Sequence, residues 1–228
     1  MIPRELIGTA QVPGGEELRL FRHGQDFYIV LDRNDLMSSR MSGSEEALAT
    51  MAIARITGKG PQRILIGGYG MGFTLRAALG VLGKDAAISV VELVPEIIQW
   101  ARGPMAELAA GCLDDPRVQL VMGDVGSTIR AGAHAYDAIL LDVDNGPDGL
   151  VRDGNGQIYS LEGLRAARHA LRPGGVLAIW SAAKDDAFAL RLRKAGYDIE
   201  EISVRARSNG KGAKHIIWFA KARPPRPS

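Results

Sequence analysis

The stretch ILIGGYGMGF, residues 64–73, restricts the fold of this chain more than any other segment. Three aliphatic residues are followed by glycines at positions 67, 68, 70 and 72. Glycine lets a backbone approach a ligand closely, and the N–H groups that open a helix attract polar and anionic groups. A nucleotide-binding loop between a strand and a helix is therefore predicted. The dinucleotide pattern G-x-G-x-x-G is not completed, because Phe73 stands at the last glycine position, and this disfavours a dehydrogenase.

Strand and helix patterns alternate from Arg63 onward. The predicted strands cover 63–67, 87–92, 117–121, 136–142, 174–181, 197–205 and 214–221, and the predicted helices cover 72–82, 95–109, 125–132, 160–171 and 184–195. This alternation predicts an α/β fold, with a mostly parallel Rossmann-like sheet between two layers of helices. The last two strands follow each other through a short loop, so the last strand should run antiparallel.

Residues 5–37 have a different pattern, in which short β-type runs alternate with turn residues. They predict a small antiparallel β meander, and SGSEEALATMAIARIT after it predicts a helix capped by serine. We therefore divide the chain into an N-terminal meander at 1–42, a Rossmann-like nucleotide-binding domain at 43–222 and a disordered tail at 223–228.

Composition excludes several classes of protein. A net charge of +2 with dispersed basic residues argues against a nucleic-acid partner. No apolar run is long enough to span a membrane, and the N-terminus lacks the apolar core of a signal peptide. The single cysteine, Cys112, suits a reducing compartment, so we expect a cytoplasmic protein. The four histidines lack metal-ligand spacing with another ligand; we expect them to be structural and predict no metal.

Three acidic residues stand at the ends of predicted strands, where ligands of open α/β sheets bind. Glu92 can accept two hydrogen bonds from a ribose diol, although an exposed strand end would also explain it. Asp124 can help to hold an adenine amine, cap the next helix, or do both. Asp142 ends a strand predicted to be buried, and there it can hold a cationic substrate or take a proton from an attacking amine. We select Asp142 as the catalytic candidate.

Further candidates surround the following loop. Asp144 and Asn145 come directly after the strand, where helping the turn is the alternative role. The Gly-rich stretch 145–159 is a candidate lid over the site. Tyr159 and Trp180 are candidates for lining the acceptor pocket, with simple packing as the alternative.

Taken together, ILIGGYGMGFTLRAAL, VVELVPEII, VMGDV, YDAILLDVDNGP and IYSLEGLRAARHALRPGGVLAIWS resemble the spermidine synthase family within the class I S-adenosylmethionine-dependent fold. The resemblance extends over residues 25–221. It implies that the glycine loop, with Gly68, Gly70, Met71 and Gly72, contacts the methionine-derived part of the cofactor. It further implies that Glu92 binds the ribose and Asp124 the adenine, and that Asp142 is the catalytic acid of a D-x-x-D motif.

The chain also differs from that family at positions that bind the linear diamine and its aminopropyl donor. Met71 stands where spermidine synthases have an aspartate that pairs with the amine of decarboxylated S-adenosylmethionine. Asn145 replaces the second aspartate of D-x-x-D, with Asp144 beside it. The polyamine-binding tyrosine has no match in SSRMSGSEEALATMA, and WSAAKDD replaces a later Gln-rich stretch.

We therefore expect a spermidine synthase-like transferase that moves a methyl group from S-adenosylmethionine to a small amine or hydroxyl acceptor. An aminopropyltransferase that uses decarboxylated S-adenosylmethionine is the alternative. A catalytically silent relative that only binds the nucleotide, or that uses the meander to oligomerise, is the second alternative. We also expect a homodimer.

Overall fold

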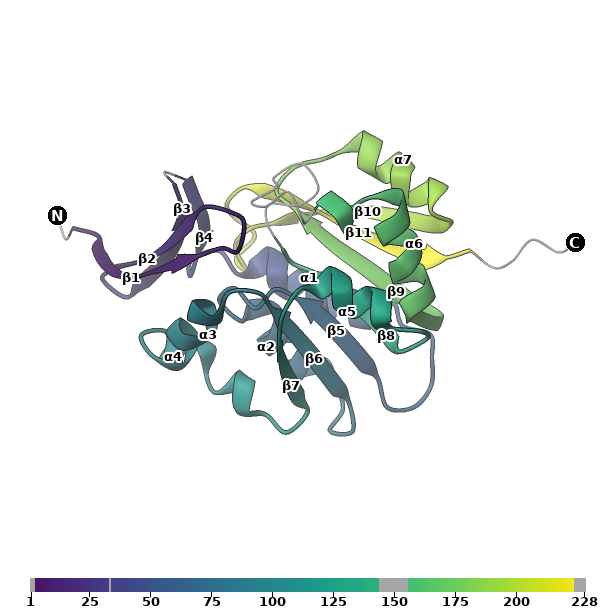
Figure 1. Ribbon diagram of the computed structural model, residues 1–228, viewed down its shortest axis with the longest axis horizontal. Helices are drawn as coiled ribbons and strands as arrows, with labels where there is room; N and C mark the ends of the chain where they lie inside the picture. Colours follow the sequence, from purple (N-terminus) through teal and green to yellow (C-terminus); the bar gives the residue numbers. More distant parts are fainter. Residues whose placement is uncertain (1–2, 33, 144–155, 224–228) are drawn as a thin grey trace, which may run out of the picture.

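The structure is a computed structural model that describes residues 3–32, 34–143 and 156–223. Two sheets make up its framework (Figure 1). The smaller sheet has the order β1-β2-β3-β4 and is antiparallel throughout, which confirms the predicted meander. Its strands are β1 (Glu5–Gln11), β2 (Glu17–His23), β3 (Asp26–Leu31) and β4 (Asn34–Ser38). Only three of these strands have a clear β-type run in the sequence, because β4 is short and begins with Asn-Asp.

The larger sheet has seven strands in the order β10-β11-β9-β8-β5-β6-β7. They are β5 (Arg63–Gly67), β6 (Ala87–Glu92), β7 (Val118–Met122), β8 (Tyr136–Leu141), β9 (Leu171–Ser181), β10 (Tyr197–Arg205) and β11 (Lys214–Ala222). β11 runs antiparallel to both β9 and β10, whereas β9, β8, β5, β6 and β7 pair in parallel. The predicted mostly parallel sheet with an antiparallel last strand is therefore confirmed. The last strand lies inside the sheet, between β9 and β10.

Helices cover both faces of this sheet. They are α1 (Gly43–Ile53), α2 (Phe73–Val81), α3 (Pro95–Arg102), α4 (Ala106–Ala109), α5 (Val125–Ala131), α6 (Leu161–Ala170) and α7 (Asp186–Lys194), with a short 3-10 helix, η1, at Cys112–Asp114. Alternate residues of β5 point to opposite faces, so Ile64 and Ile66 enter one core cluster and Leu65 the other. The first cluster contains residues of α1, α2, α3 and the small sheet, and the second contains residues of α5, α6 and α7.

Two local predictions were wrong. The predicted helix 95–109 is interrupted between α3 and α4, where Gly103 and Pro104 cannot continue an α-helix. Ser42 precedes α1 but makes no side-chain capping hydrogen bond, so the serine cap is absent. The hydroxyl of the next serine, Ser44, is instead bonded to groups described below.

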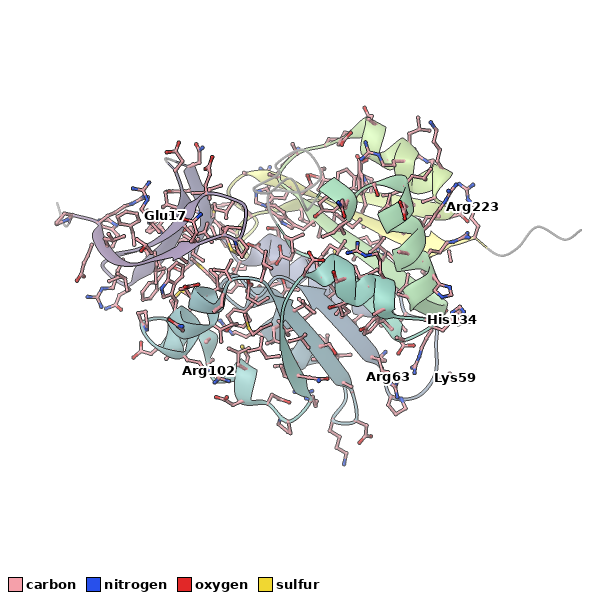
Figure 2. All side chains as sticks on the ribbon, in the orientation of Figure 1. Glu17, Lys59, Arg63, Arg102, His134 and Arg223 are labelled. Atoms are coloured by element: carbon pink, nitrogen blue, oxygen red, sulfur yellow. The ribbon has the colours of Figure 1, made fainter. Side chains whose placement is uncertain are left out.

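Charged side chains such as Glu17, Lys59 and Arg223 lie on the outside of the molecule (Figure 2). The proposed boundary at residues 42 and 43 coincides with the start of α1. The division into domains stays a prediction, because residues of the small sheet share a core cluster with those of the large one. Residues 224–228 of the proposed disordered tail lie outside the described residues.

Candidate active site

The glycine loop, residues 67–72, connects β5 to α2. Gly68, Gly70 and Gly72 have φ angles of 86°, 54° and 80°, in the left-handed region that favours glycine. A Cβ on Gly68 would lie 2.6 Å from the backbone oxygen of Asp142, so this glycine lets the ends of β5 and β8 approach each other. The loop conformation therefore depends on its glycines.

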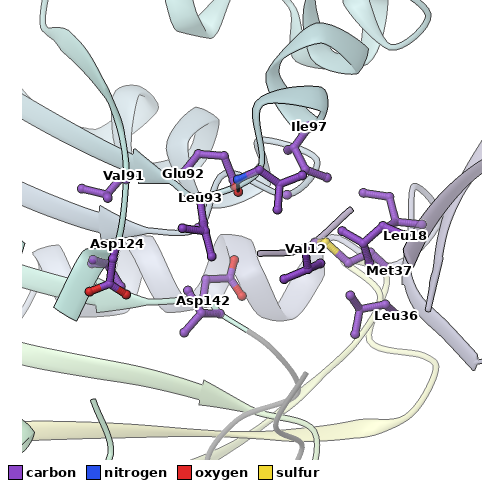
Figure 3. A pocket seen from close by; sticks show the side chains of 17 residues that line it. Val12, Leu18, Leu36, Met37, Val91, Glu92, Leu93, Ile97, Asp124 and Asp142 are labelled. Carbon is purple, nitrogen blue, oxygen red and sulfur yellow. Dashed lines mark hydrogen bonds between the residues drawn. The ribbon is translucent and has the colours of Figure 1, made fainter. Parts of the chain in front are cut away.

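A first cavity opens at the carboxyl ends of β5, β6, β7 and β8. Including its open mouth it encloses about 800 Å³, a size that suits a small-molecule site. Acidic residues from three strand ends line it, namely Glu92, Asp124 and Asp142, together with Gly68 and Gly70. The structure thus brings together five of the residues that the sequence selects (Figure 3).

The opposite wall of this cavity comes from the small sheet and the turn beside it (Figure 3). Its side chains are apolar: Val12, Leu18, Ile29, Leu36 and Met37. Sequence reasoning missed this wall, because strand patterns show which side chains are apolar but not what they pack against. The small sheet therefore completes the cavity.

Glu92 lies at the end of β6 and is almost completely buried. One carboxylate oxygen accepts a hydrogen bond from the backbone N–H of Tyr69 at 2.9 Å, and the other accepts one from Val94 at 2.8 Å. Burial raises the pKa of Glu92, while the backbone N–H groups of Val94, Tyr69, Leu93 and Gly70 oppose the rise. The backbone thus holds this carboxylate in the wall of the first cavity.

Asp124 performs the capping role that its position allows. Its Oδ1 accepts hydrogen bonds from the backbone N–H of Ser127 at 2.7 Å and from the Ser127 hydroxyl at 2.8 Å, at the start of α5. Asp124 also lines the first cavity, so capping orients the carboxylate without removing it from the site.

Asp142 follows β8 and lies at the junction of two cavities. Its Oδ2 accepts a hydrogen bond of 2.6 Å from the hydroxyl of Thr74, in the first turn of α2. Burial raises the pKa of Asp142 to about 6, and the bond from Thr74 opposes the rise. A carboxyl with such a pKa can both hold and release a proton near neutral pH.

Met71 and Gly72 do not line either cavity. The side chain of Met71 is 1% exposed and belongs to the first core cluster, so it packs beneath the glycine loop. Gly72 precedes α2, and a Cβ there would lie 2.6 Å from the hydroxyl oxygen of Tyr69. The apolar side chain of Met71 thus packs in the core, and a contact of this residue with the cofactor stays a prediction.

A second cavity adjoins the first at Asp142. Its other lining residues are Asp35, Leu36, Met37, Ser38, Met41, Glu45, Trp180, Ala182 and His215. Trp180 is thus found in a cavity wall, as proposed for an acceptor site. Its buried indole N–H has no hydrogen-bond partner among the described residues. The ring packs edge-on against His215, with 4.7 Å between centroids.

Sequence reasoning missed Glu45, Ser44 and His215. Glu45 lies in the first turn of α1 and is 7% exposed. The Ser44 hydroxyl donates a hydrogen bond to Glu45 Oε2 at 2.6 Å and is also bonded to His215 Nδ1 at 2.8 Å. One signal was available, because Glu45 shares the buried helix face of Leu48, Ala49 and Ala52, where a carboxyl is out of place.

Tyr159 takes the packing role. It is 1% exposed within the second core cluster, its hydroxyl donates to the backbone oxygen of Val143 at 3.2 Å, and its ring packs edge-on against Phe188. It does not line either cavity. Asp144, Asn145 and the greater part of the proposed lid, 145–155, lie outside the described residues.

In the described residues, no group of three or more His, Cys, Asp or Glu side chains is arranged to hold a metal ion. In the same part of the chain, no helix has the length and apolar character needed to cross a membrane. The cytoplasmic location and the homodimer stay predictions.

The geometry agrees with what comparisons with known proteins find. Residues 41–189 match the model of the spermine/spermidine synthase domain. The chain is 29% identical, over 86% of its length, to a polyamine aminopropyltransferase of Mycobacterium tuberculosis. It is 31% identical, over 69% of its length, to putrescine N-methyltransferase 2 of Nicotiana attenuata. It covers only 38% and 39% of the lengths of these two relatives.

Solved structures show the same fold. A spermidine synthase in complex with the transition-state analogue AdoDATO superposes with a TM-score of 0.75 at 19% identity, over 97% of this chain and 75% of that chain. The spermidine synthase from Thermotoga maritima gives a TM-score of 0.74 at 19% identity, over 97% and 74% of the two chains.

Proposed function

Because the chain belongs to the spermine/spermidine synthase domain family, we propose that it transfers an alkyl group from a sulfonium nucleoside to an amine. The nucleoside is S-adenosylmethionine or its decarboxylated form, either of which supplies an electrophilic carbon bonded to sulfur. The observation that carries the proposal is the position of Asp142, a partly buried carboxyl between two adjoining cavities. One cavity would take the nucleoside and the other the amine.

The first cavity fits the nucleoside. Glu92 is buried, anchored through both oxygens by backbone N–H groups, and can accept bonds from the ribose hydroxyls. Asp124 and its backbone would contact the adenine, while the apolar side chains of the small sheet cover the base and sugar. The glycine loop would hold the methionine-derived part, because Gly68 and Gly70 line the cavity without a side chain.

Asp142 would act on the amine. Its carboxylate attracts an ammonium to the junction and then takes a proton from it, so that the nitrogen can use its lone pair. Thr74 fixes the carboxyl through the bond to Oδ2. Holding the nitrogen beside the electrophilic carbon would supply much of the rate enhancement, because such transfers depend mainly on positioning.

Aminopropyl transfer is the first candidate reaction. The match to a polyamine aminopropyltransferase extends over 86% of the chain, compared with 69% for a putrescine N-methyltransferase.

Methyl transfer is the second candidate, and a specific observation favours it. The glycine loop, residues 67–72, contains no Asp or Glu that could pair with an ammonium. A buried ammonium without a partner costs about 3–5 kcal/mol. The amino acid part of intact S-adenosylmethionine is a zwitterion, which loop N–H groups can bind without an added carboxylate.

Calorimetry with both nucleosides, followed by mass spectrometry of products formed with a panel of amines, tests the proposal. Aminopropyl transfer predicts tighter binding of the decarboxylated form and a product extended by an aminopropyl group. Methyl transfer predicts the reverse preference and a methylated amine. Binding without any transfer would refute both reactions and favour the silent relative.

A further inference from the structure

A cluster of three polar side chains lies beside the proposed reaction centre. It consists of Glu45 on α1, Ser44 next to it and His215 on β11. We propose that Glu45 and Asp142 form a carboxyl pair that holds one proton when the second cavity is empty, and that a cationic amine expels this proton through Ser44 and His215. This inference rests on the proposed amine site.

The charges around the second cavity require a cation. Three carboxyl groups line it, those of Asp35, Glu45 and Asp142, and none of its described lining residues is a lysine or arginine. Asp35 is already paired, because Arg4 donates to both of its oxygens at 2.8 Å. Within the described part of the chain, neither Glu45 nor Asp142 has a cationic partner. Glu45 is buried and Asp142 partly buried, and two such carboxylates without a cation are unfavourable, so the pair keeps a proton until a cation arrives.

The pKa shifts agree with this charge balance. Burial and then the charge of Asp142 raise the pKa of Glu45 to about 8, with a smaller contribution from Glu46 on the same helix. The pKa of Asp142 is about 6, so at neutral pH the pair holds about one proton. An ammonium placed between the two carboxyls reverses the balance, because it stabilises both charged forms.

The hydrogen bonds from Glu45 through Ser44 to His215 form a path along which the proton can leave. When Glu45 is ionised, Ser44 donates to it and accepts from His215 Nδ1; when Glu45 is protonated, both bonds can reverse. Burial lowers the pKa of His215, so the imidazole is neutral near pH 7 and can pass a proton on without keeping it. His215 is only partly buried, whereas Ser44 is fully buried.

Release of a proton from the carboxyl pair balances the protons of the reaction. Alkyl transfer to an ammonium replaces an N–H bond by a C–N bond, while the C–S bond breaks and its electron pair stays on sulfur. One proton is therefore released overall. On our proposal it leaves Glu45 when the amine binds, and Asp142 then takes the proton that the nitrogen loses. The carboxyl pair thus ends the cycle with one proton, as it began.

Binding of 1,4-diaminobutane, used as a probe, tests the proposal without turnover. Calorimetry at pH 7 in buffers of different ionisation enthalpy measures the protons exchanged. We expect release of about one proton per bound amine for the natural protein. Glu45→Gln keeps the shape of the side chain and should abolish most of that release. Glu46→Gln, on the same helix turn but outside the cavity, is the matched control and should release as many protons as the natural protein.

Ser44→Ala tests the role of the hydrogen-bond chain separately. Glu45 remains, but it loses a hydrogen bond that lowers its pKa, so the midpoint of proton release should move to higher pH. Failure of the diamine to bind, binding without proton release, or unchanged release in Glu45→Gln would each overturn the inference. If products form but proton release does not depend on Glu45, the proposed transferase function stands and the proposed carboxyl pair is refuted. If protons are released but neither nucleoside gives a product, the carboxyl pair stands and the transferase function is refuted.

Discussion

Replacing Gly68 by alanine should destabilise the protein by straining the contact between β5 and β8. Gly68 has a φ of 86°, and its added Cβ would lie 2.6 Å from the backbone oxygen of Asp142 and 3.2 Å from a methyl carbon of Val143. A backbone oxygen at the end of a central strand cannot move away as a flexible side chain can. Alanine therefore strains its own backbone and displaces Asp142.

The size of the effect follows from these two contributions. A residue with a Cβ in the left-handed region costs about 1–2 kcal/mol. Overpacking against a fixed neighbour adds roughly 1–3 kcal/mol, so we expect the free energy of unfolding to fall by about 2–5 kcal/mol. For a chain of this size, that corresponds to a decrease in Tm of about 4–20 °C.

Thermal unfolding followed by circular dichroism measures this, with Gly80→Ala as the matched control. Gly80 lies in α2 on the surface, and nothing stands within 4 Å of an added Cβ. Alanine there should raise stability by about 0.5–1 kcal/mol, because it favours the helix. A Tm for Gly68→Ala within about 2 °C of the natural protein would refute the reasoning.

Three further predictions concern the carboxyl groups. Asp142→Asn should lower turnover, measured in product assays, at least about 100-fold. Its affinity for the nucleoside, measured by calorimetry, should stay within about threefold of the natural protein. Unchanged turnover would exclude a role of Asp142 as base. Glu92→Gln should lower stability by about 1–3 kcal/mol, since its amide would turn an N–H group toward Tyr69 or Val94; an unchanged denaturation midpoint would contradict this. The free energy of unfolding should fall as pH rises from about 4.5 to about 8, because the pKa of Glu45 is higher in the folded chain, which then binds more protons than the unfolded chain. Tm measured across this range should fall less in Glu45→Gln, and an equal fall would argue against the shift.

Patterns along the chain predicted the large sheet well. The bounds of β5 and β6 match the predicted strands 63–67 and 87–92, because in each an apolar run ends at a glycine or an acid. The interruption at Gly103 and Pro104 was overlooked, although both residues are strong signals against a continuous helix. β4 was not distinguished as a strand, since only its pairing with β3 stabilises that conformation.

The same patterns predicted the acidic residues of the candidate site. Parallel strands bring their carboxyl ends to one edge, so Glu92, Asp124 and Asp142 were expected to meet there. The rest of the site depends on long-range packing. His215 reaches the second cavity because β11 inserts between β9 and β10, and neither spacing nor composition indicates that order.

The position of β11 has a consequence for synthesis of the protein. β9 has seven consecutive buried residues, and one of its two edges is covered only by β11. As the chain leaves the ribosome, β8 and β9 are available for pairing well before residue 214 has been made. During that interval β9 presents an apolar strand edge, the type of surface that chaperones protect from aggregation. β11, which is translated after both of its neighbours, therefore both covers this edge and positions the histidine of the amine cavity.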